Sequence, residues 1–262
     1  MATYTSYNQV GLKENVDDLI SNITPFATPM QAMIKNEKVN ARTFSFLEDS
    51  LADSQVNAQV EGGDASMLTL TDATERTNNT QILSKAFQIS ATADAVATYG
   101  RAKETAHQLA KKLKEIKKDY ERAMVGVAQA SVAGSSTTAR KMTSLLNQIS
   151  TSVDAGGGSA DALTEAKLLQ AGQTAYDNNS DVDTFMIKPA DAQIVAGFSA
   201  ASGRNREISQ GKTLVNAIDL YISPYGEYRV VLNRELKVDH ALLIDPTMFK
   251  ACTLRPFTRT LL

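Results

Sequence analysis

The stretch from Arg101 to Ala130 constrains the fold most, because it is amphipathic over thirty residues without interruption. It contains no proline and one interior glycine, Gly126. At about 1.5 Å per residue, such a helix would be roughly 45 Å long, well beyond the usual helix of a globular domain. Small or apolar residues recur at steps of three and four and predict one stripe along the helix: Ala102, Ala106, Leu109, Leu113, Ile116, Tyr120, Ala123 and Val127.

Two arrangements compete for this predicted helix. The steps of its stripe fit four heptads, which is typical of a coiled-coil partner helix. Alternatively, the helix lies on a sheet, with its stripe facing down and its lysines in water. Three of the eight stripe positions are alanine, which fills a dimer seam poorly. We therefore favour the helix on a sheet.

The composition is that of a soluble globular protein. The chain has 262 residues, of which 43% are hydrophobic and 21% charged, enough for one elaborate domain or two ordinary ones. The net charge of −2 gives no overall attraction to nucleic acid. The single Cys252 excludes an intrachain disulfide, and we expect a buried, inert thiol. No apolar run approaches 18 residues and the N-terminus does not resemble a signal peptide. We therefore expect a chain without a membrane span that works in a cytoplasm or in something assembled there.

The residues before the long helix divide into two segments. Residues 1–41 are expected to form an arm, with a short helix around Val16–Ile23 and an apolar patch at Met30, Met33 and Ile34 that needs a larger surface to lie on. Residues 42–91 are expected to form an extended flap. A strand at Thr43–Leu47 leads out, a polar run follows around Gly62, and a strand at Gln81–Ala91 returns.

The residues after the long helix predict an α+β or α/β domain. Glycine-rich residues around 156–158 mark a boundary, and Ser159 or Asp161 can cap the next helix. A buried strand at Thr184–Lys188 precedes a helix that begins at Pro189 and runs to about Ala201. Further strands are predicted at Leu214–Ser223, Tyr228–Asn233, Ala241–Asp245 and Thr253–Leu262.

No catalytic or cofactor-binding constellation is predicted. The triplet Gly211-Lys212-Thr213 ends like a phosphate-binding loop, but the required glycine five residues earlier is Arg206. His107 and His240 are far apart in sequence and have no neighbour at metal-ligand spacing. We therefore expect neither an enzyme nor a protein with a metal or cofactor.

The basic residues of the long helix permit three interpretations. Eight lysines and arginines between residues 101 and 122 could contact phosphates. Four acidic residues are interspersed, however, and no aromatic side chains are placed for base stacking. A solvated face is the plainest interpretation, and a docking surface for protein is the second.

Short motifs along nearly the whole chain resemble the major capsid proteins of tailed bacteriophages, which have the Hong Kong-type capsid fold. Each motif is weak alone, but together and in order they are fairly specific. The family usually continues with further strand after the position of Phe257. The motifs are Tyr7-Asn8-Gln9-Val10-Gly11, Ile23-Thr24-Pro25, Thr28-Pro29, Glu61-Gly62, Asp64-Ala65, Arg76-Thr77-Asn78-Asn79-Thr80-Gln81-Ile82, Gly100-Arg101, Glu104, Lys118-Asp119-Tyr120-Glu121, Tyr221-Ile222-Ser223, Gly226, Asn233-Arg234, Asp245-Pro246 and Leu254-Arg255-Pro256-Phe257.

This resemblance implies an α+β capsid fold divided into five parts. They would be an N-terminal arm (1–41), an extended β-hairpin loop or flap (42–91), a spine helix with peripheral domain (92–158), an axial α/β domain (159–240) and strands returning to the peripheral domain (241–262). Copies would assemble as pentamers and hexamers into an icosahedral shell around double-stranded DNA, in the cytoplasm of a bacterial host. The implied partners are a portal, a decoration protein, DNA held non-specifically and, since few residues precede the flap, a separate scaffolding protein.

Opposite charges on the flap and the spine helix predict an inter-subunit interface. Residues 44–84 carry seven acidic and one basic group, a net charge of −6, whereas residues 101–122 carry eight basic and four acidic groups, a net charge of +4. In the competing account the lysines face inward and offset DNA phosphate. A cytoplasmic nucleic-acid-binding or coiled-coil adaptor built on the basic helix is the alternative function. The predicted interface residues are Glu48, Asp49, Asp53, Glu61, Asp64, Asp72, Lys111, Lys114, Lys118 and Arg122.

Overall fold

The described residues fall into two units. A computed structural model describes residues 26–52, 54–63, 67, 70, 72–96, 103–153, 162–201 and 220–259, with the side chains of 199–201 excepted. Unit 1 comprises residues 1–27 and 83–119, and unit 2 comprises residues 28–82 and 120–262. The predicted helix around Val16–Ile23 and the caps at Ser159 and Asp161 lie outside the described residues.

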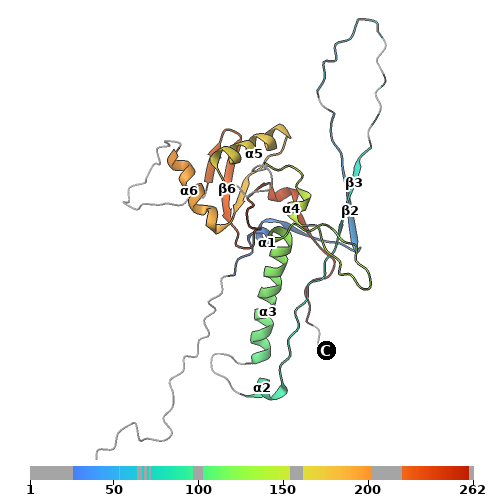
Figure 1. Cartoon of the computed structure of the whole chain (residues 1–262). Helices are drawn as coiled ribbons and strands as arrows, with labels where there is room; N and C mark the ends of the chain where they lie inside the picture. Colours follow the sequence, from blue (N-terminus) through green and yellow to red (C-terminus); the bar gives the residue numbers. More distant parts are fainter. Residues whose placement is uncertain are drawn as a thin grey trace, which may run out of the picture. The chain divides into compact units, whose positions relative to one another are not determined.

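Unit 1 contains the short helix α2 (Ala91–Ala95) and most of the long helix α3 (Glu104–Glu121) (Figure 1). Ser90 begins α2, since its side-chain oxygen accepts a hydrogen bond from the Ala93 amide at 3.2 Å. Asp94 then accepts the Thr105 amide at 2.9 Å, in the first turn of α3. A side chain of α2 thus satisfies a backbone donor that the start of α3 leaves free.

The long helix changes its winding at Glu121, so the prediction of one α-helix to Ala130 is wrong. Arg122–Gly126 form a π-helical segment, and Val127 is already extended. Gly126 lies so close to another segment that a Cβ atom there would be 2.4 Å from the Glu235 carbonyl oxygen. The Lys237 amide, from a loop remote in sequence, donates to the Val125 carbonyl at 3.1 Å. In a longer helix, this carbonyl would accept an amide of the next helical turn instead.

A mixed four-stranded sheet forms the centre of unit 2. β4 and β6 are parallel, whereas β5 is antiparallel to β6 and β7 is antiparallel to β4. The three predicted strands near residues 184, 228 and 241 are confirmed, and the strand predicted at 214–223 is described from residue 220 onward. In sheet order β5–β6–β4–β7, the strands are Leu220–Ser223, Gly226–Leu232, Thr184–Ile187 and Leu242–Ile244.

Both faces of the sheet are covered at β4, as its unbroken apolar run predicts. Helices α5 (Glu165–Asp177) and α6 (Ala192–Ala201) cover one face (Figure 1), where Phe185 and Ile187 pack against their side chains. Met186 points to the other face and packs with Met124 and Val125 of the π-helical segment. The last part of the helix therefore packs on a sheet, but through Met124 and Val125, which lie outside the predicted stripe. The stripe residues Leu113 and Val127 are exposed, contrary to the prediction.

The structure confirms the predicted start of α6 and corrects that of α5. A 3₁₀ turn at Pro189–Asp191 leads into α6. The cap of α5 is Thr164, whose side-chain oxygen accepts the Lys167 amide at 3.4 Å. The remaining short helical elements are α1 (Pro29–Met33), α4 (Leu145–Gln148) and a 3₁₀ turn at Pro246–Met248.

Two small two-stranded sheets complete unit 2. β1 (Lys35–Lys38) pairs in parallel with β8 (Lys250–Thr253), and β2 (Thr43–Glu48) pairs antiparallel with β3 (Thr74–Asn79). The apolar patch at Met30, Met33 and Ile34 packs against the core of unit 2, as predicted. Residues 29–38, expected within the arm, thus form α1 and β1 of this unit.

Two predicted strands are wrong. The flap returns at β3, and residues 80–90 are in no strand, because the partner β2 extends only from Thr43 to Glu48 and its register ends at Asn79. The final strand is predicted at Thr253–Leu262, but the strand observed there is β8, which ends at Thr253. Residues 254–259 are in no strand: β1 pairs as far as Thr253, and Pro256 has no amide to donate to a ladder.

Candidate assembly surfaces

The predicted flap is an antiparallel hairpin that opens into a long loop. The strands pair from Thr43 opposite Asn79 to Glu48 opposite Thr74. Among the described residues between Glu48 and Thr74 there is no strand, and a turn at Glu61–Gly62 reverses the chain. Gly62 has φ 82°, a conformation that favours glycine. Figure 1 shows the loop extending beyond β2 and β3.

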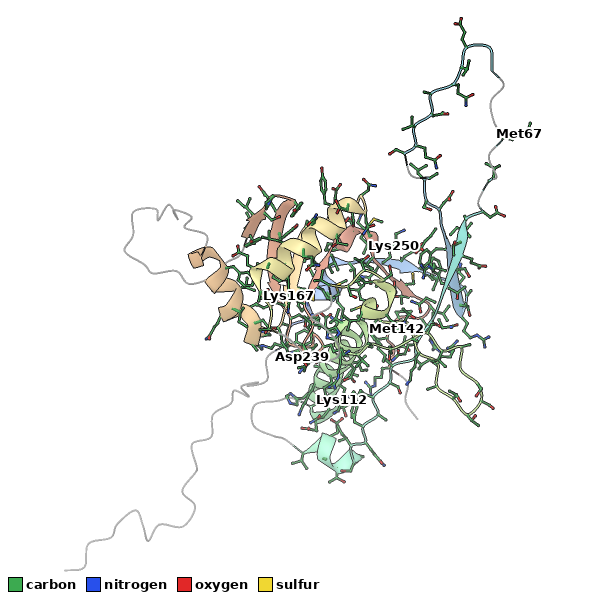
Figure 2. The ribbon with its side chains drawn as sticks, turned by 45° about the horizontal axis from the view of Figure 1, so that its top comes forward. Met67, Lys112, Met142, Lys167, Asp239 and Lys250 are labelled. Atoms are coloured by element: carbon green, nitrogen blue, oxygen red, sulfur yellow. The ribbon has the colours of Figure 1, made fainter. Side chains whose placement is uncertain are left out.

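Apolar side chains of this loop are almost fully exposed. Figure 2 shows Met67 on the open loop beyond the paired strands. Burying one such side chain completely is worth about 1.5–3 kcal/mol, so the loop carries apolar side chains that would be stabilised by a covering partner. The side chains and their exposed fractions are Leu51 98%, Val56 98%, Val60 84%, Met67 101% and Leu70 94%.

The predicted acidic interface residues that are described all lie exposed on the flap. Glu48 pairs with Arg76 across the two strands at 2.9 Å, so the structure brings these two groups together. Asp49 accepts the amide of the next residue at 2.9 Å. Glu61 and Asp72 are exposed in the loop. The two other predicted positions, Asp53 and Asp64, lie outside the described residues.

The predicted basic interface residues lie on helix α3 and just beyond it. Lys111 and Lys114 are exposed, and Lys118 is partly buried. Arg122 is also exposed, but it is the first residue of the π-helical segment. The flap and most of α3 belong to different units, so contact between the acidic and basic sets stays a prediction.

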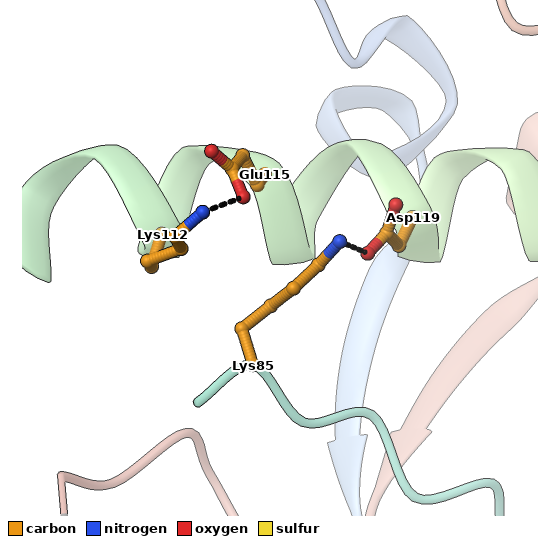
Figure 3. A network of polar contacts seen from close by, with 4 residues as sticks. All are labelled: Lys85, Lys112, Glu115 and Asp119. Carbon is orange, nitrogen blue, oxygen red and sulfur yellow. Dashed lines mark hydrogen bonds and ion pairs between the residues drawn. The ribbon is translucent and has the colours of Figure 1, made fainter. Parts of the chain in front are cut away.

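Two acidic residues of α3 are bound by lysines of unit 1 (Figure 3). Lys112 contacts Glu115 at 2.8 Å, one turn away, and this lysine holds the pKa of the Glu115 carboxyl below its usual range. Lys85 contacts Asp119 at 2.7 Å, and this hydrogen bond raises the pKa of the lysine. These carboxylates are therefore engaged within the chain.

A third acidic residue of the helix, Glu121, is fully buried. A charge count from the sequence treats it as part of the surface, which the structure corrects. Nothing in the local pattern separates Glu121 from Glu115, because both occur in a charged stretch of the same helix.

The sequence predicts no role for the amide side chains at the end of β3, where the flap joins the rest of unit 2. Asn79 donates to the Ser131 hydroxyl at 2.9 Å, and Gln129 donates to Gln81 Oε1 at 2.9 Å. Asn78 Oδ1 accepts the Thr143 amide at 2.9 Å. These bonds join the end of β3 to the loop after the π-helical segment. The signal in the sequence is the amide-rich run Asn78-Asn79-Thr80-Gln81.

The described part of the chain contains no grouping of metal-ligating side chains. No three histidine, cysteine, aspartate or glutamate side chains in it could hold one ion. Cys252 is partly buried on β8, and burial raises the pKa of its thiol. None of the helices in these residues is both long and apolar enough for a bilayer.

Comparisons with known proteins show what this chain is similar to. The chain is 29% identical over 307 residues to the major capsid protein of Escherichia phage Phieco32, with 98% of this chain and 87% of that protein covered. The fold is similar to a chain in the capsid structure of cyanophage P-SCSP1u, with a TM-score of 0.54 at 12% identity over 89% of this chain and 71% of that chain. A second solved structure, the capsid of a native GTA particle, gives a TM-score of 0.57 at 12% identity, with 90% of this chain and 78% of that chain covered.

These matches confirm the predicted α+β capsid fold, and the adaptor function is not favoured. The model of the SU10 major capsid protein family matches residues 1–262, the whole chain. The chain therefore belongs to the SU10 major capsid protein family and is a shell-forming structural protein of a phage capsid.

Proposed function

We propose that copies of this chain form the pentamers and hexamers of an icosahedral shell, in which the flap of each subunit lies on its neighbour. The exposure of the flap carries this proposal: five apolar side chains in the loop are at least 84% exposed in the single chain. A neighbouring subunit would remove them from water. Five such side chains, at about 1.5–3 kcal/mol each when fully buried, provide a sizeable driving force for association.

We further propose that the acidic flap docks against the basic face of α3 on the neighbour. The pairing of Asp119 with Lys85, which lies outside residues 101–122, and the burial of Glu121 support a face more basic than the sequence count indicates. The pair of Lys112 and Glu115 cancels within that count. Each exposed pair is worth only about 0–1 kcal/mol. Attraction fades beyond about 8 Å at physiological salt. The charges would therefore act on register and association rate more than on final stability.

The proposed partners beyond the subunit itself are a separate scaffolding protein, a portal, a decoration protein and double-stranded DNA held non-specifically. Assembly in the cytoplasm of a bacterial host belongs to the same proposal. We also propose the division into arm, flap, spine with peripheral domain, axial domain and returning strands. The hairpin β2–β3 supports the flap, and the strands β4, β5 and β6 support the axial domain. β7, at Leu242–Ile244, pairs with β4 in the same sheet, so the proposed axial domain extends beyond residue 240.

Expression with the scaffolding protein tests the shell itself. Negative-stain images should show closed shells or capsomers. Unassembled subunits should be cut by protease between Glu48 and Arg76, and assembled ones should be protected. A discrete dimer that binds DNA, or equal protease resistance in both states, would contradict the proposal.

Charge reversal tests the docking of the flap. Changing Asp49, Asp53 and Asp64 to lysine should slow assembly at low salt, and the same variant should approach the wild-type rate at high salt. Three exposed acids outside the flap provide a control with the same change in net charge: Asp177, Asp181 and Glu227. Reversal of Lys111, Lys114 and Lys118 to glutamate should partly rescue the flap variant. A wild-type assembly rate at both salt concentrations would refute the electrostatic docking.

A further inference from the structure

Helix α1 begins without a cap of its own. Thr28 precedes it, and the Thr28 side chain makes no capping hydrogen bond. Pro29 occupies the first position, where a missing amide costs nothing. The Ala32 amide already bonds the Thr28 carbonyl at 3.3 Å. The amides of Met30 and Gln31 are therefore the two donors of this helix start that need an acceptor from elsewhere.

Glu121 supplies that acceptor from about ninety residues further along the chain. Its Oε1 accepts the Met30 amide at 2.8 Å, and its Oε2 accepts the Gln31 amide at 3.1 Å. The Gln31 side chain adds a hydrogen bond from Nε2 to Oε2 at 3.2 Å. The carboxylate thus takes the place of the missing N-cap, although it belongs to the last turn of α3.

A third segment meets the same carboxylate. Asn233, which directly follows β6, donates from Nδ2 to Glu121 Oε1 at 2.8 Å, and its own Oδ1 accepts the Glu235 amide at 2.9 Å. All four donors to Glu121 are neutral amides. Burial raises the pKa of Glu121, and the hydrogen bonds from Met30, Gln31 and Asn233 oppose that rise. A fully buried carboxylate held this way is costly unless every acceptor site is used.

We propose that Glu121 is a latch: its carboxylate holds α1 against the end of α3 and the end of β6, and loss of the carboxylate releases α1. The four hydrogen bonds join three segments that are remote in sequence. The latch goes beyond the shell function and does not depend on it, since it acts within unit 2 of one subunit.

The polarity of the four hydrogen bonds makes the latch specific for a carboxylate. Two oxygens, each accepting two hydrogen bonds, are required, and only glutamate offers both at this length. In Glu121→Gln, the side-chain NH₂ group would face two donors whichever way the amide turned. Two of the four bonds would be lost, although the shape of the side chain would hardly change.

Hydrogen exchange of the full-length, unassembled subunit tests the latch. In Glu121→Gln, the Met30 and Gln31 amides should exchange at least about tenfold faster than in the wild type. A hydrogen bond to a charged group stabilises the closed state by more than the free energy that corresponds to a factor of about ten, and its loss therefore raises the equilibrium constant for opening at least about tenfold. Glu115→Gln is the matched control, since it makes the same chemical change on the same helix and should leave both amides unaffected. Shell formation plays no part in this measurement, so its failure would not be mistaken for failure of the latch.

A second variant keeps the proposal testable if Glu121→Gln does not fold. In Glu121→Gln combined with Asn233→Asp, the new amide can donate to the new carboxylate, which should restore the fold and part of the protection of α1. The wild type provides a further check, because both amides must exchange slowly in it. Fast exchange of Met30 and Gln31 in the wild type, equal exchange in wild type and Glu121→Gln, or a double variant no better than Glu121→Gln would each overturn the latch.

Discussion

The contact between Gly172 of α5 and Tyr228 of β6 permits a quantitative test of how tightly α5 packs on the four-stranded sheet. A Cβ atom added at Gly172 would lie 2.3 Å from the Tyr228 hydroxyl oxygen and 3.3 Å from Cζ of the same ring. Tyr228 is fully buried, and its hydroxyl has no hydrogen-bond partner among the described residues. The helix therefore needs glycine because of one buried oxygen atom.

The magnitudes follow from this geometry. Gly172→Ala gains about 1 kcal/mol from helix propensity, but overpacking at 2.3 Å costs up to about 3 kcal/mol, a net loss of about 2 kcal/mol. Tyr228→Phe removes an unsatisfied buried hydroxyl and should stabilise by about 1 kcal/mol. With the oxygen gone, the added Cβ atom still lies 3.3 Å from Cζ, so the double variant should be at most about 2 kcal/mol more stable than the wild type. The two changes together should show a coupling energy of up to about 3 kcal/mol.

Urea unfolding of unassembled subunits, followed by far-ultraviolet circular dichroism, measures these differences. Gly197→Ala is the control, because Gly197 lies inside α6 and a Cβ atom there meets no atom within 4 Å. It should stabilise by up to about 1 kcal/mol in both backgrounds. If Gly172→Ala costs as much with phenylalanine at 228 as with tyrosine, the hydroxyl is not the cause and the reasoning fails.

Three further predictions concern the flap root, alkaline stability and maturation. Gln129→Glu should lower the free energy of unfolding by about 1.5–3 kcal/mol, because a carboxylate cannot donate to Gln81 and Met142, whereas Gln81→Glu keeps its acceptor and should cost under about 0.5 kcal/mol; equal urea midpoints would contradict this. Burial, with the neighbouring Cys252 and Glu121, raises the pKa of Tyr120 from 10.0 to about 12. The protonated Tyr120 hydroxyl therefore makes its full contribution to the free energy of unfolding below pH 10, and about 2–3 kcal/mol of that free energy should be lost as the pH rises through 12. Tyr120→Phe should not show this loss. Parallel profiles of unfolding free energy against pH for the two proteins would contradict the assignment. Boiled mature particles should give one band near 28 kDa in denaturing gels, because the hairpin and its loop (residues 43–79) contain no lysine to form an isopeptide bond, and Lys85 beyond them is bound to Asp119; a ladder of multimers would refute this.

Several elements could be predicted from the sequence because their signals are local. The apolar run at Thr184–Ile187 marks a strand buried on both faces, and Pro189 marks the start of the next helix. The polar, acidic run after Thr43–Glu48 indicates a loop that cannot bury itself, and its exposed apolar side chains agree. Each of these signals depends on residues within one or two turns or strands of one another.

Only the tertiary structure decided where elements end and which charged groups lie at the surface. Helix α3 continues its amphipathic pattern in the sequence, but the Lys237 amide and the close approach of Glu235 to Gly126 end it. Glu115 and Glu121 have the same side chain on the same helix, yet one pairs with a lysine near the surface and the other holds α1 in the core. A hydrogen bond between residues about ninety positions apart leaves no periodic trace in the sequence, because its geometry exists only after the segments have packed.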